Sequence, residues 1–232
     1  MNIKPLLDYG LSENQSEQFE KYFELLIEWN EKINLTAITE ENEVITKHFI
    51  DSLMCFKSGV ITDGASVIDV GTGAGFPGIP MKICSSSLNV TLLDSLSKRL
   101  NFLNEVIDKL ELKNITTVHA RAEDGGNDSA LRERFDIAVS RAVANLATLS
   151  ELCLPFVKVG GYFISMKGPG AQEEIKEAKG AIKILGGKVE SVIPYEIPAT
   201  DLSHNLVIIK KISPTPKKYP RSAPKPAKMP LK

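Results

Sequence analysis

The sequence is poor in residues that build disulfide frameworks and metal sites. Its 232 residues include only three cysteines, widely spaced in apolar surroundings: Cys55, Cys84 and Cys153. The three histidines lie in separate segments, without the spacing of metal ligands: His48, His119 and His204. We therefore expect neither disulfides nor a bound metal, and the cysteine pattern favours a reducing cytoplasm.

Long hydrophobic runs are also missing. No apolar run approaches the roughly 20 residues that a membrane-spanning helix needs, and the first ten residues lack the apolar segment of a signal peptide. The chain is 43% apolar, enough for one buried core with length left for an extension. We expect a cytoplasmic, monomeric protein that makes no membrane contact.

Acidic residues are absent from the C-terminal end. Residues 210–232 carry 8 basic and no acidic side chains, whereas residues 1–64 carry 12 acidic and 5 basic ones, although the net charge is only −1. This segregation is typical of a chain that meets a polyanion at its basic end. A solvated tail explains the charge pattern equally well.

Glycine is concentrated in one stretch. Residues 67–78 read Val-Ile-Asp-Val-Gly-Thr-Gly-Ala-Gly-Phe-Pro-Gly, an apolar run that stops in glycines before a helical pattern. Glycine permits positive φ angles and lets a ligand approach the main chain. The stretch predicts a strand, a ligand-binding loop and a helix; a glycine-rich turn without a ligand is the simpler alternative.

Two kinds of ligand suit such a loop. Residues 73–78 match the spacing Gly-x-Gly-x-x-Gly of dinucleotide sites, but Pro77 has no NH group for a pyrophosphate. Asp69, at the end of the strand, would repel a pyrophosphate and suits a cationic ligand. S-adenosylmethionine is such a ligand, and NAD remains open at this point.

The region before this loop is predicted to be helical. Ser12 and Gln15 form a capping box before a helix that extends to about Trp29, and Thr39 could cap a second helix. We interpret the aromatic stripe of the first helix as a packing face. His48, Asp51 and Ser52 could be helix caps or partner contacts.

Strands after the loop bring polar residues to one edge. Asp94 follows the strand 90–93, at the position where a doubly wound sheet holds a ribose. Arg99 lies in the first turns of the next helix, where a cation opposes the helix dipole and so is either solvated or faces an anion. Ala122 and Glu123 follow the strand 115–119, and could read an adenine edge.

Two further strands, 135–139 and 162–166, deliver Arg141 and Lys167 to this edge, the second strand starting after a turn at Gly160 and Gly161. The last two strands, 188–195 and 204–212, have no helix between them, so they should pair antiparallel.

These patterns predict an α/β fold in three parts. A helical extension (residues 1–64) precedes a domain with a mostly parallel sheet and a final antiparallel hairpin (residues 65–212). In residues 213–232 proline alternates with lysine, and we expect a flexible tail that builds no core.

A sheet that opens with Asp-x-Gly-x-Gly-x-Gly and ends in a hairpin resembles class I S-adenosylmethionine-dependent methyltransferases, which have seven strands on a Rossmann-like plan. Ordered motifs closely resemble the ribosomal RNA small-subunit methyltransferase G family, also called glucose-inhibited division protein B. They cover about residues 12–220 and are as follows: Glu28-Trp29-Asn30, Asn34-Leu35-Thr36, His48-Phe49-Ile50-Asp51-Ser52, residues 69–80, Leu93-Asp94-Ser95 with Lys98-Arg99, and Ser140-Arg141-Ala142.

The resemblance implies S-adenosylmethionine-dependent methylation of N7 of a guanine in the decoding-region loop of 16S ribosomal RNA, on the RNA or the small ribosomal subunit, without a catalytic acid or base. It implies these cofactor-binding residues: Gly71, Gly73, Gly75 and Phe76 at the methionine end, Asp94 at the ribose, Ala122 and Glu123 at the adenosine end, and Arg141 closing the site. The RNA-binding candidates are Arg99, Lys167, Lys217, Lys218 and Arg221.

Two rival functions remain at this level. An NAD-dependent oxidoreductase is supported by the glycine spacing and Asp94, and opposed by Pro77, Asp69 and the closing hairpin. A non-catalytic RNA-binding module of the ribosome is supported by the basic tail. Binding of labelled NAD would favour the first, and undetectable cofactor binding the second.

Overall fold

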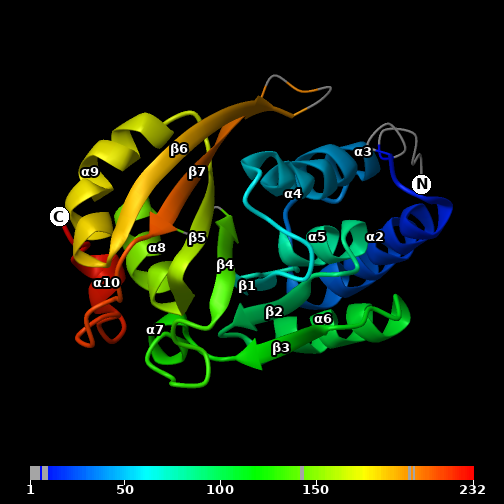
Figure 1. Cartoon of the computed structure of the whole chain (residues 1–232). Helices are drawn as coiled ribbons and strands as arrows, with labels where there is room; N and C mark the ends of the chain where they lie inside the picture. Colours follow the sequence, from blue (N-terminus) through cyan, green and yellow to red (C-terminus); the bar gives the residue numbers. More distant parts are fainter. Residues whose placement is uncertain (1–5, 7–9, 142–143, 198–199, 201) are drawn as a thin grey trace.

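The computed structural model describes residues 6, 10–141, 144–197, 200 and 202–232. Its centre is a seven-stranded sheet in the order β3-β2-β1-β4-β5-β7-β6, parallel except that β7 runs antiparallel to both its neighbours (Figure 1). This confirms the α/β class and the final hairpin. The strands are β1 (Ser66–Val70), β2 (Asn89–Asp94), β3 (Ile115–His119), β4 (Phe135–Arg141), β5 (Val157–Lys167), β6 (Gly187–Glu196) and β7 (Ser203–Lys211).

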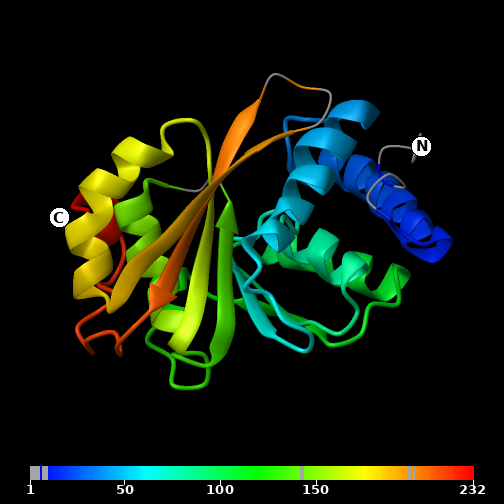
Figure 2. The same ribbon diagram turned by 45° about the horizontal axis from the view of Figure 1, so that its top comes forward.

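Helices cover both faces of this sheet (Figures 1 and 2). On one face lie α2 (Glu13–Ile33), α3 (Glu41–Val44), the π-helix η1 (Ile45–Ile50), α4 (Asp51–Leu53), the 3-10 helix η2 (Met54–Ser58), α5 (Gly78–Cys84) and α6 (Ser97–Lys109). On the other lie α7 (Ala122–Gly125), α8 (Leu146–Cys153), the 3-10 helix η3 (Leu154–Phe156), α9 (Ala171–Ile184) and α10 (Lys225–Lys228). The helical extension and the basic tail therefore lie on opposite sides of the sheet.

Local signals explain the first helices in part. The predicted capping box is confirmed, because Ser12 Oγ accepts from the Gln15 backbone at 3.3 Å and Gln15 Oε1 accepts from the Ser12 backbone at 2.9 Å. Thr39 is not the cap of the second helix. Glu40 takes that position, since its carboxylate accepts the Glu43 NH at 2.9 Å.

Strand β5 begins earlier than the glycines suggested. Gly160 and Gly161 lie within it and form no separate turn. Gly160 has a φ of 93°, and the register shifts between Phe135 and Ile137 of the neighbouring strand. A bulge therefore absorbs the unusual backbone angle, and pairing continues through it.

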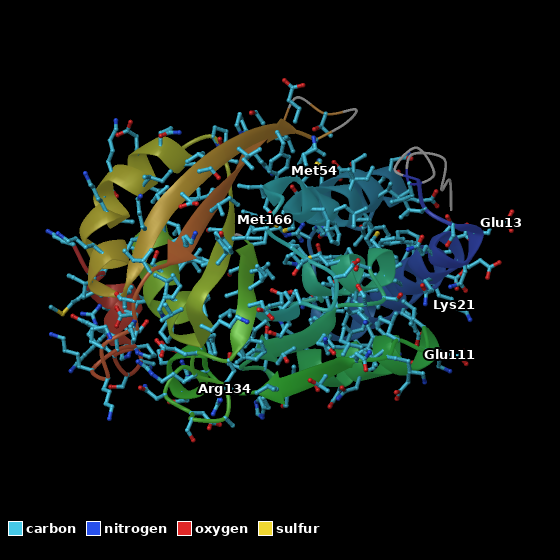
Figure 3. The ribbon with its side chains drawn as sticks, in the orientation of Figure 1. Glu13, Lys21, Met54, Glu111, Arg134 and Met166 are labelled. Carbon is cyan, nitrogen blue, oxygen red and sulfur yellow. The ribbon has the colours of Figure 1, made fainter. Side chains whose placement is uncertain are left out.

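The extension shares its core with the sheet. Phe19, Tyr22 and Phe49 are fully buried in one hydrophobic cluster with residues of β1 and β2, which confirms the aromatic stripe as a packing face. Figure 3 places Met54 and Met166 where η2 meets β5, and Cys55 Sγ lies 3.5 Å from Met166 Sδ. Among the described helices, none is long and apolar enough to span a membrane.

The tail also packs on the sheet domain. Tyr219 is 92% buried in the second hydrophobic cluster, so the expectation that residues 213–232 add nothing to a core is wrong at this position. Arg132 holds the segment by donating to the Tyr219 carbonyl at 2.8 Å and the Thr215 carbonyl at 2.8 Å. Hydrogen bonds from Arg132 thus help to hold residues 213–232 on the domain, although this segment has few apolar side chains to bury.

Candidate active site

The glycine loop after β1 closes onto the end of β2. The NH groups of Gly71 and Thr72 donate to the Leu93 carbonyl at 2.9 and 3.1 Å. Gly71 and Gly73 have φ angles of 72° and 61°, which side chains other than glycine rarely adopt. The loop therefore bends sharply and presents its backbone at the carboxyl edge of the sheet.

Asp69 supports this loop from beneath. Its Oδ2 accepts from Thr72 Oγ1 at 2.7 Å and from the Gly78 NH at 2.9 Å, and the side chain is fully buried. Burial raises its pKa to about 6, while these hydrogen bonds act in the opposite direction. Asp69 therefore positions the loop, and its charge does not face the cavity that the loop borders.

Gly75 packs the loop against the extension. A Cβ at this position would lie 2.6 Å from Ile79 Cδ1 and 2.7 Å from the hydroxyl of Tyr22. The same hydroxyl donates to the Ala74 carbonyl at 2.5 Å. Gly75 thus allows the close approach of Tyr22 that holds the loop.

A cavity of about 520 Å³ opens beside the loop, at the carboxyl ends of β1, β2, β3 and β4. Seven of the eight predicted cofactor-binding residues line it: Gly71, Gly73, Phe76, Asp94, Ala122, Glu123 and Arg141. The eighth, Gly75, lies behind the lining. The structure therefore brings together residues from four strand ends and adds Leu149 and Leu152 of α8 as apolar wall.

Asp94 is held in place on the cavity wall. Its carboxylate is 97% buried and accepts from the NH groups of Gly73 at 3.0 Å and Leu96 at 2.9 Å. Arg99 NH1 lies 3.4 Å from Asp94 Oδ2. Arg99, a predicted RNA contact, thus lines the cavity and is paired with Asp94, the residue predicted to bind the ribose.

Phe76 lines the cavity together with residues of the extension. Its ring stacks on His48 with a centroid distance of 4.6 Å, and the Arg141 guanidinium carbon lies 5.0 Å from its centroid. Burial, and then the charge of Arg141, lower the pKa of His48 to about 4. His48 Nε2 lies 2.8 Å from Thr36 Oγ1. A neutral imidazole therefore fits this wall.

Arg141 ends β4 in a buried ion pair. Its NH1 lies 3.0 Å from Oδ2 of Asp51, which is 98% buried in α4. Asp51 Oδ1 accepts from the Tyr195 hydroxyl at 2.8 Å and from His204 Nδ1 at 3.1 Å. Burial alone would raise the pKa of Asp51, but the contacts of His204, Arg141 and Tyr195 hold it below its ordinary value.

A second cavity, of about 740 Å³, adjoins the first. His48 and Arg141 line both cavities, so together they form the shared wall. The other residues that line the second cavity come from the extension, the ends of β4 and β5, α9 and the final hairpin: Ile38, Lys47, Asp51, Ala144, Asn145, Met166, Lys167, Gly168, Glu174, Ile197, Leu202 and His204. Two neighbouring ligands could therefore meet at His48 and Arg141.

Lys167 lies inside this second cavity. It is 93% buried, and its Nζ is 2.8 Å from Glu174 Oε2 and donates to the Ala144 carbonyl at 2.5 Å. An RNA phosphate on the protein surface would not reach it without breaking these contacts. Lys167 is thus placed to act on a group that enters the cavity.

The tail candidates fall into two groups. Lys217 and Lys218 are exposed. Arg221 instead forms a two-oxygen ion pair with Glu151 of α8, at 2.9 Å from Nε to Oε1 and 2.6 Å from NH2 to Oε2, and Glu151 is fully buried. Arg221 therefore anchors the tail to the helix that carries Leu149 and Leu152.

Sequence reasoning gave no site role to three residues near the shared wall, and it offered a fourth, Asp51, only as a helix cap or partner contact; the three are Thr36, Tyr195 and His204. Thr36 and Asp51 belong to motifs of the family resemblance, and this signal could have placed them. Nothing local marks Tyr195 or His204. Ala142 of the Ser-Arg-Ala motif lies outside the described residues.

The chain matches the model of the family described as rRNA small subunit methyltransferase G over residues 15–202. It is 59% identical over 222 residues to a protein of Clostridium beijerinckii named ribosomal RNA small subunit methyltransferase G, covering 96% of this chain and 93% of that one. A protein of the same name from Lachnoclostridium phytofermentans is 57% identical over 225 residues, covering 97% and 93%.

Solved structures share the fold at low identity. The M. jannaschii TYW2 structure in complex with AdoMet superposes with a TM-score of 0.56 at 17% identity, covering 76% of this chain and 80% of that one. A SAM-dependent methyltransferase from Aquifex aeolicus has a TM-score of 0.52 at 20% identity, covering 73% and 93%.

Proposed function

Because the chain belongs to the rRNA small subunit methyltransferase G family, we propose that it methylates N7 of a guanine in the decoding-region loop of 16S ribosomal RNA. The cofactor is S-adenosylmethionine. One observation carries the proposal beyond the family: two cavities share the wall of His48 and Arg141, as expected where a cofactor and a target base meet.

The first cavity suits the cofactor. Asp94 offers a fixed carboxylate to the ribose, and Ala122 and Glu123 line the end that would take the adenine. Gly71 and Gly73 leave the loop backbone open to the methionine part, while Gly75 keeps the loop in place. The bound cofactor supplies the methyl group as a sulfonium substituent.

The second cavity suits the target nucleotide. Sequence-specific RNA recognition uses unstacked bases, and enzymes that modify a base draw it into a pocket. A guanine in this cavity would turn N7 towards the shared wall. Lys167, which the sequence assigns to RNA, would then contact the bound nucleotide inside the cavity. Arg141 lines both cavities.

The residues of the site act by orientation. Guanine N7 carries a lone pair and no proton, so the reaction needs no general base. The walls built by Phe76 and His48 exclude water and fix the approach; such orientation supplies about 7 to 11 kcal/mol in favourable cases. Asp51 neutralises Arg141, which limits the positive charge beside a purine that becomes cationic.

The RNA path is proposed from the exposed tail lysines, Lys217 and Lys218, and from the half-buried Arg99 at the cavity rim, which is paired with Asp94. All three are candidates for phosphate contacts. Arg221 contributes to this path by anchoring the tail, since its guanidinium is paired with Glu151.

The test is transfer of a labelled methyl group from S-adenosylmethionine to small ribosomal subunits, and to their naked RNA, that lack this modification. The product is mapped by chemical cleavage at N7-methylguanine. We expect one cleavage, in the decoding-region loop. Label at another nucleotide would refute the proposed target, and no label together with binding of NAD would refute the reaction.

A further inference from the structure

The second cavity contains an acidic group and a histidine that N7 methylation does not require as acid or base. Asp51 is 98% buried, and His204 Nδ1 donates to its Oδ1 at 3.1 Å. The rings of His204 and Tyr195 meet edge to face, with centroids 5.8 Å apart. Two contacts therefore hold the imidazole in one orientation on the cavity wall.

This orientation decides which ring nitrogen meets a ligand. Since Nδ1–H faces Asp51, Nε2 lies on the opposite side of the ring, and the side chain is 28% exposed. Within the described part of the chain, no hydrogen bond from Nε2 is seen. Fixing the proton on one ring nitrogen makes the other an acceptor in the neutral imidazole.

Charged side chains surround the cavity on several sides. Lys47, Arg141 and Lys167 face it from three elements, against the carboxylates of Asp51 and Glu174. Arg141 NH1 lies 3.0 Å from Oδ2 of Asp51, and the Nδ1–H of His204 completes the hydrogen bonds of that carboxylate at Oδ1.

The chemistry of purines then identifies the edge that is read. With N7 turned to the shared wall, the adjoining Watson–Crick edge of the base lies along the side of the cavity next to that wall. His204 lies on this side, because Asp51 joins it to Arg141: Oδ2 is 3.0 Å from Arg141 NH1, and Oδ1 accepts from His204 Nδ1 at 3.1 Å. Guanine presents a donor there, N1–H, whereas adenine presents an unprotonated N1. An acceptor at that place receives a hydrogen bond from guanine N1–H. With adenine, the lone pair of the acceptor would face the lone pair of N1.

We infer that His204, oriented by Asp51, accepts a hydrogen bond from N1–H of the target guanine and so selects guanine over adenine. The inference rests on the proposed function. His204 is a recognition residue in it, and Asp51 a positioning residue.

The experiment uses reconstituted small subunits whose target position carries guanine, hypoxanthine (inosine) or 2-aminopurine. All three keep N7, and only 2-aminopurine lacks N1–H. The unaltered protein should methylate inosine within a few-fold of guanine, and 2-aminopurine about 10- to 100-fold more slowly, as expected for one unpaired buried acceptor. Equal rates on guanine and 2-aminopurine would overturn the inference.

The variant His204→Ala should slow guanine while leaving 2-aminopurine nearly unchanged, so that the preference between the two collapses. His204→Gln, whose amide oxygen can accept, should restore part of it. His119→Ala is the matched control, because His119 is an exposed histidine on β3 outside both cavities. Its preference should equal that of the unaltered protein.

Further outcomes separate the possible failures. If His204→Ala keeps full discrimination while the unaltered protein methylates guanine N7, the inference fails and the function stands. If the unaltered protein does not methylate guanine N7, the proposed function fails. 6-Thioguanine keeps N1–H but has a weaker acceptor at position 6. If 6-thioguanine is methylated as slowly as 2-aminopurine, and His204→Ala removes that difference from guanine, His204 contacts the exocyclic group. This result would overturn the inference. Cofactor affinity, unchanged in His204→Ala, shows that the variant is folded.

Discussion

The helical extension and the basic tail are both appendages in sequence, but they support the first cavity in different ways. The extension supplies side chains directly: His48 and Thr36 line the cavity. The tail acts through other elements, because Arg221 binds Glu151 of α8 and Asn127 Nδ2 donates to both the Glu123 and Pro220 carbonyls, at 2.9 and 3.1 Å.

Their charges differ as their roles do. The acidic groups of the extension include Asp51, whose charge is used inside the protein. The tail divides its cations between one internal ion pair at Arg221 and exposed lysines such as Lys217 and Lys218. Net charge is thus a poor guide to which appendage touches RNA, since only the exposed cations can release counterions from it.

The largest effect should follow loss of Asp51, the link between the extension and the sheet. Asp51→Ala leaves Arg141 with no counter-charge and His204 with no acceptor, so we expect methyl transfer to fall by about 100-fold or more. Unfolding by urea should show a loss of about 3 to 5 kcal/mol. Asp51→Asn keeps the shape of the side chain, so it should lose less stability than Asp51→Ala but still lose most of the activity. An Asp51→Asn enzyme as active as the unaltered protein would contradict the role of the charge.

Next in size is loss of the tail anchor. Arg221→Ala leaves Glu151 buried and unpaired, and we expect it to cost about 3 kcal/mol of the free energy of unfolding and several-fold in cofactor affinity. Denaturant titration and calorimetric binding of S-adenosylmethionine measure both. Adding Glu151→Gln should recover most of the stability. Cofactor affinity equal to that of the unaltered protein would show that the tail does not support the adenosine end.

A smaller effect is expected in the pH dependence of stability, where His48 and the loop carboxylate Asp69 contribute with opposite signs. His48 has a pKa of about 4 when folded and 6.5 when unfolded, so acidification between these values favours the unfolded state. Asp69 has a pKa of about 6 when folded and 3.8 when unfolded, so acidification between those values favours the folded state. Each slope is at most about 1.4 kcal/mol per pH unit.

The two slopes oppose each other between about pH 4 and pH 6. Wild-type stability should therefore change little there, whereas His48→Gln should become more stable as the pH falls. Urea unfolding of both proteins at pH 6 and pH 4.5 gives the comparison. Parallel changes in the two proteins would show that His48 takes up its proton equally in both states.

The smallest effect is expected from the exposed tail lysines. Lys217→Ala with Lys218→Ala should leave stability and cofactor affinity unaltered, because both side chains are exposed. RNA affinity should fall by a few-fold, and the slope of log affinity against log salt should become less steep by about 1.4, near 0.7 per contact. Filter binding over a salt series tests this; an unchanged slope would remove these lysines from the RNA path.

Local patterns account for much of the cavity. The loop 71–75 and Asp94 could be assigned because backbone angles and the ends of parallel strands follow from nearby residues. The same reasoning put Gly75 in the lining, but its space is taken by Tyr22, 53 positions earlier in the chain. It gave Lys167 and Arg221 to RNA, and only folding provides Glu174 and Glu151 as their partners.

Residue types within short windows were enough to assign the strands along the chain, the glycine loop, the carboxylate after β2 and the family. The shared wall, and the pairing of Asp51 with Arg141 and His204, arise only on folding, because these partners lie 90 and 153 positions away. A buried charge needs partners, but any distant donor can satisfy it. Which donor does so depends on how the extension and the hairpin pack at the edge of the sheet.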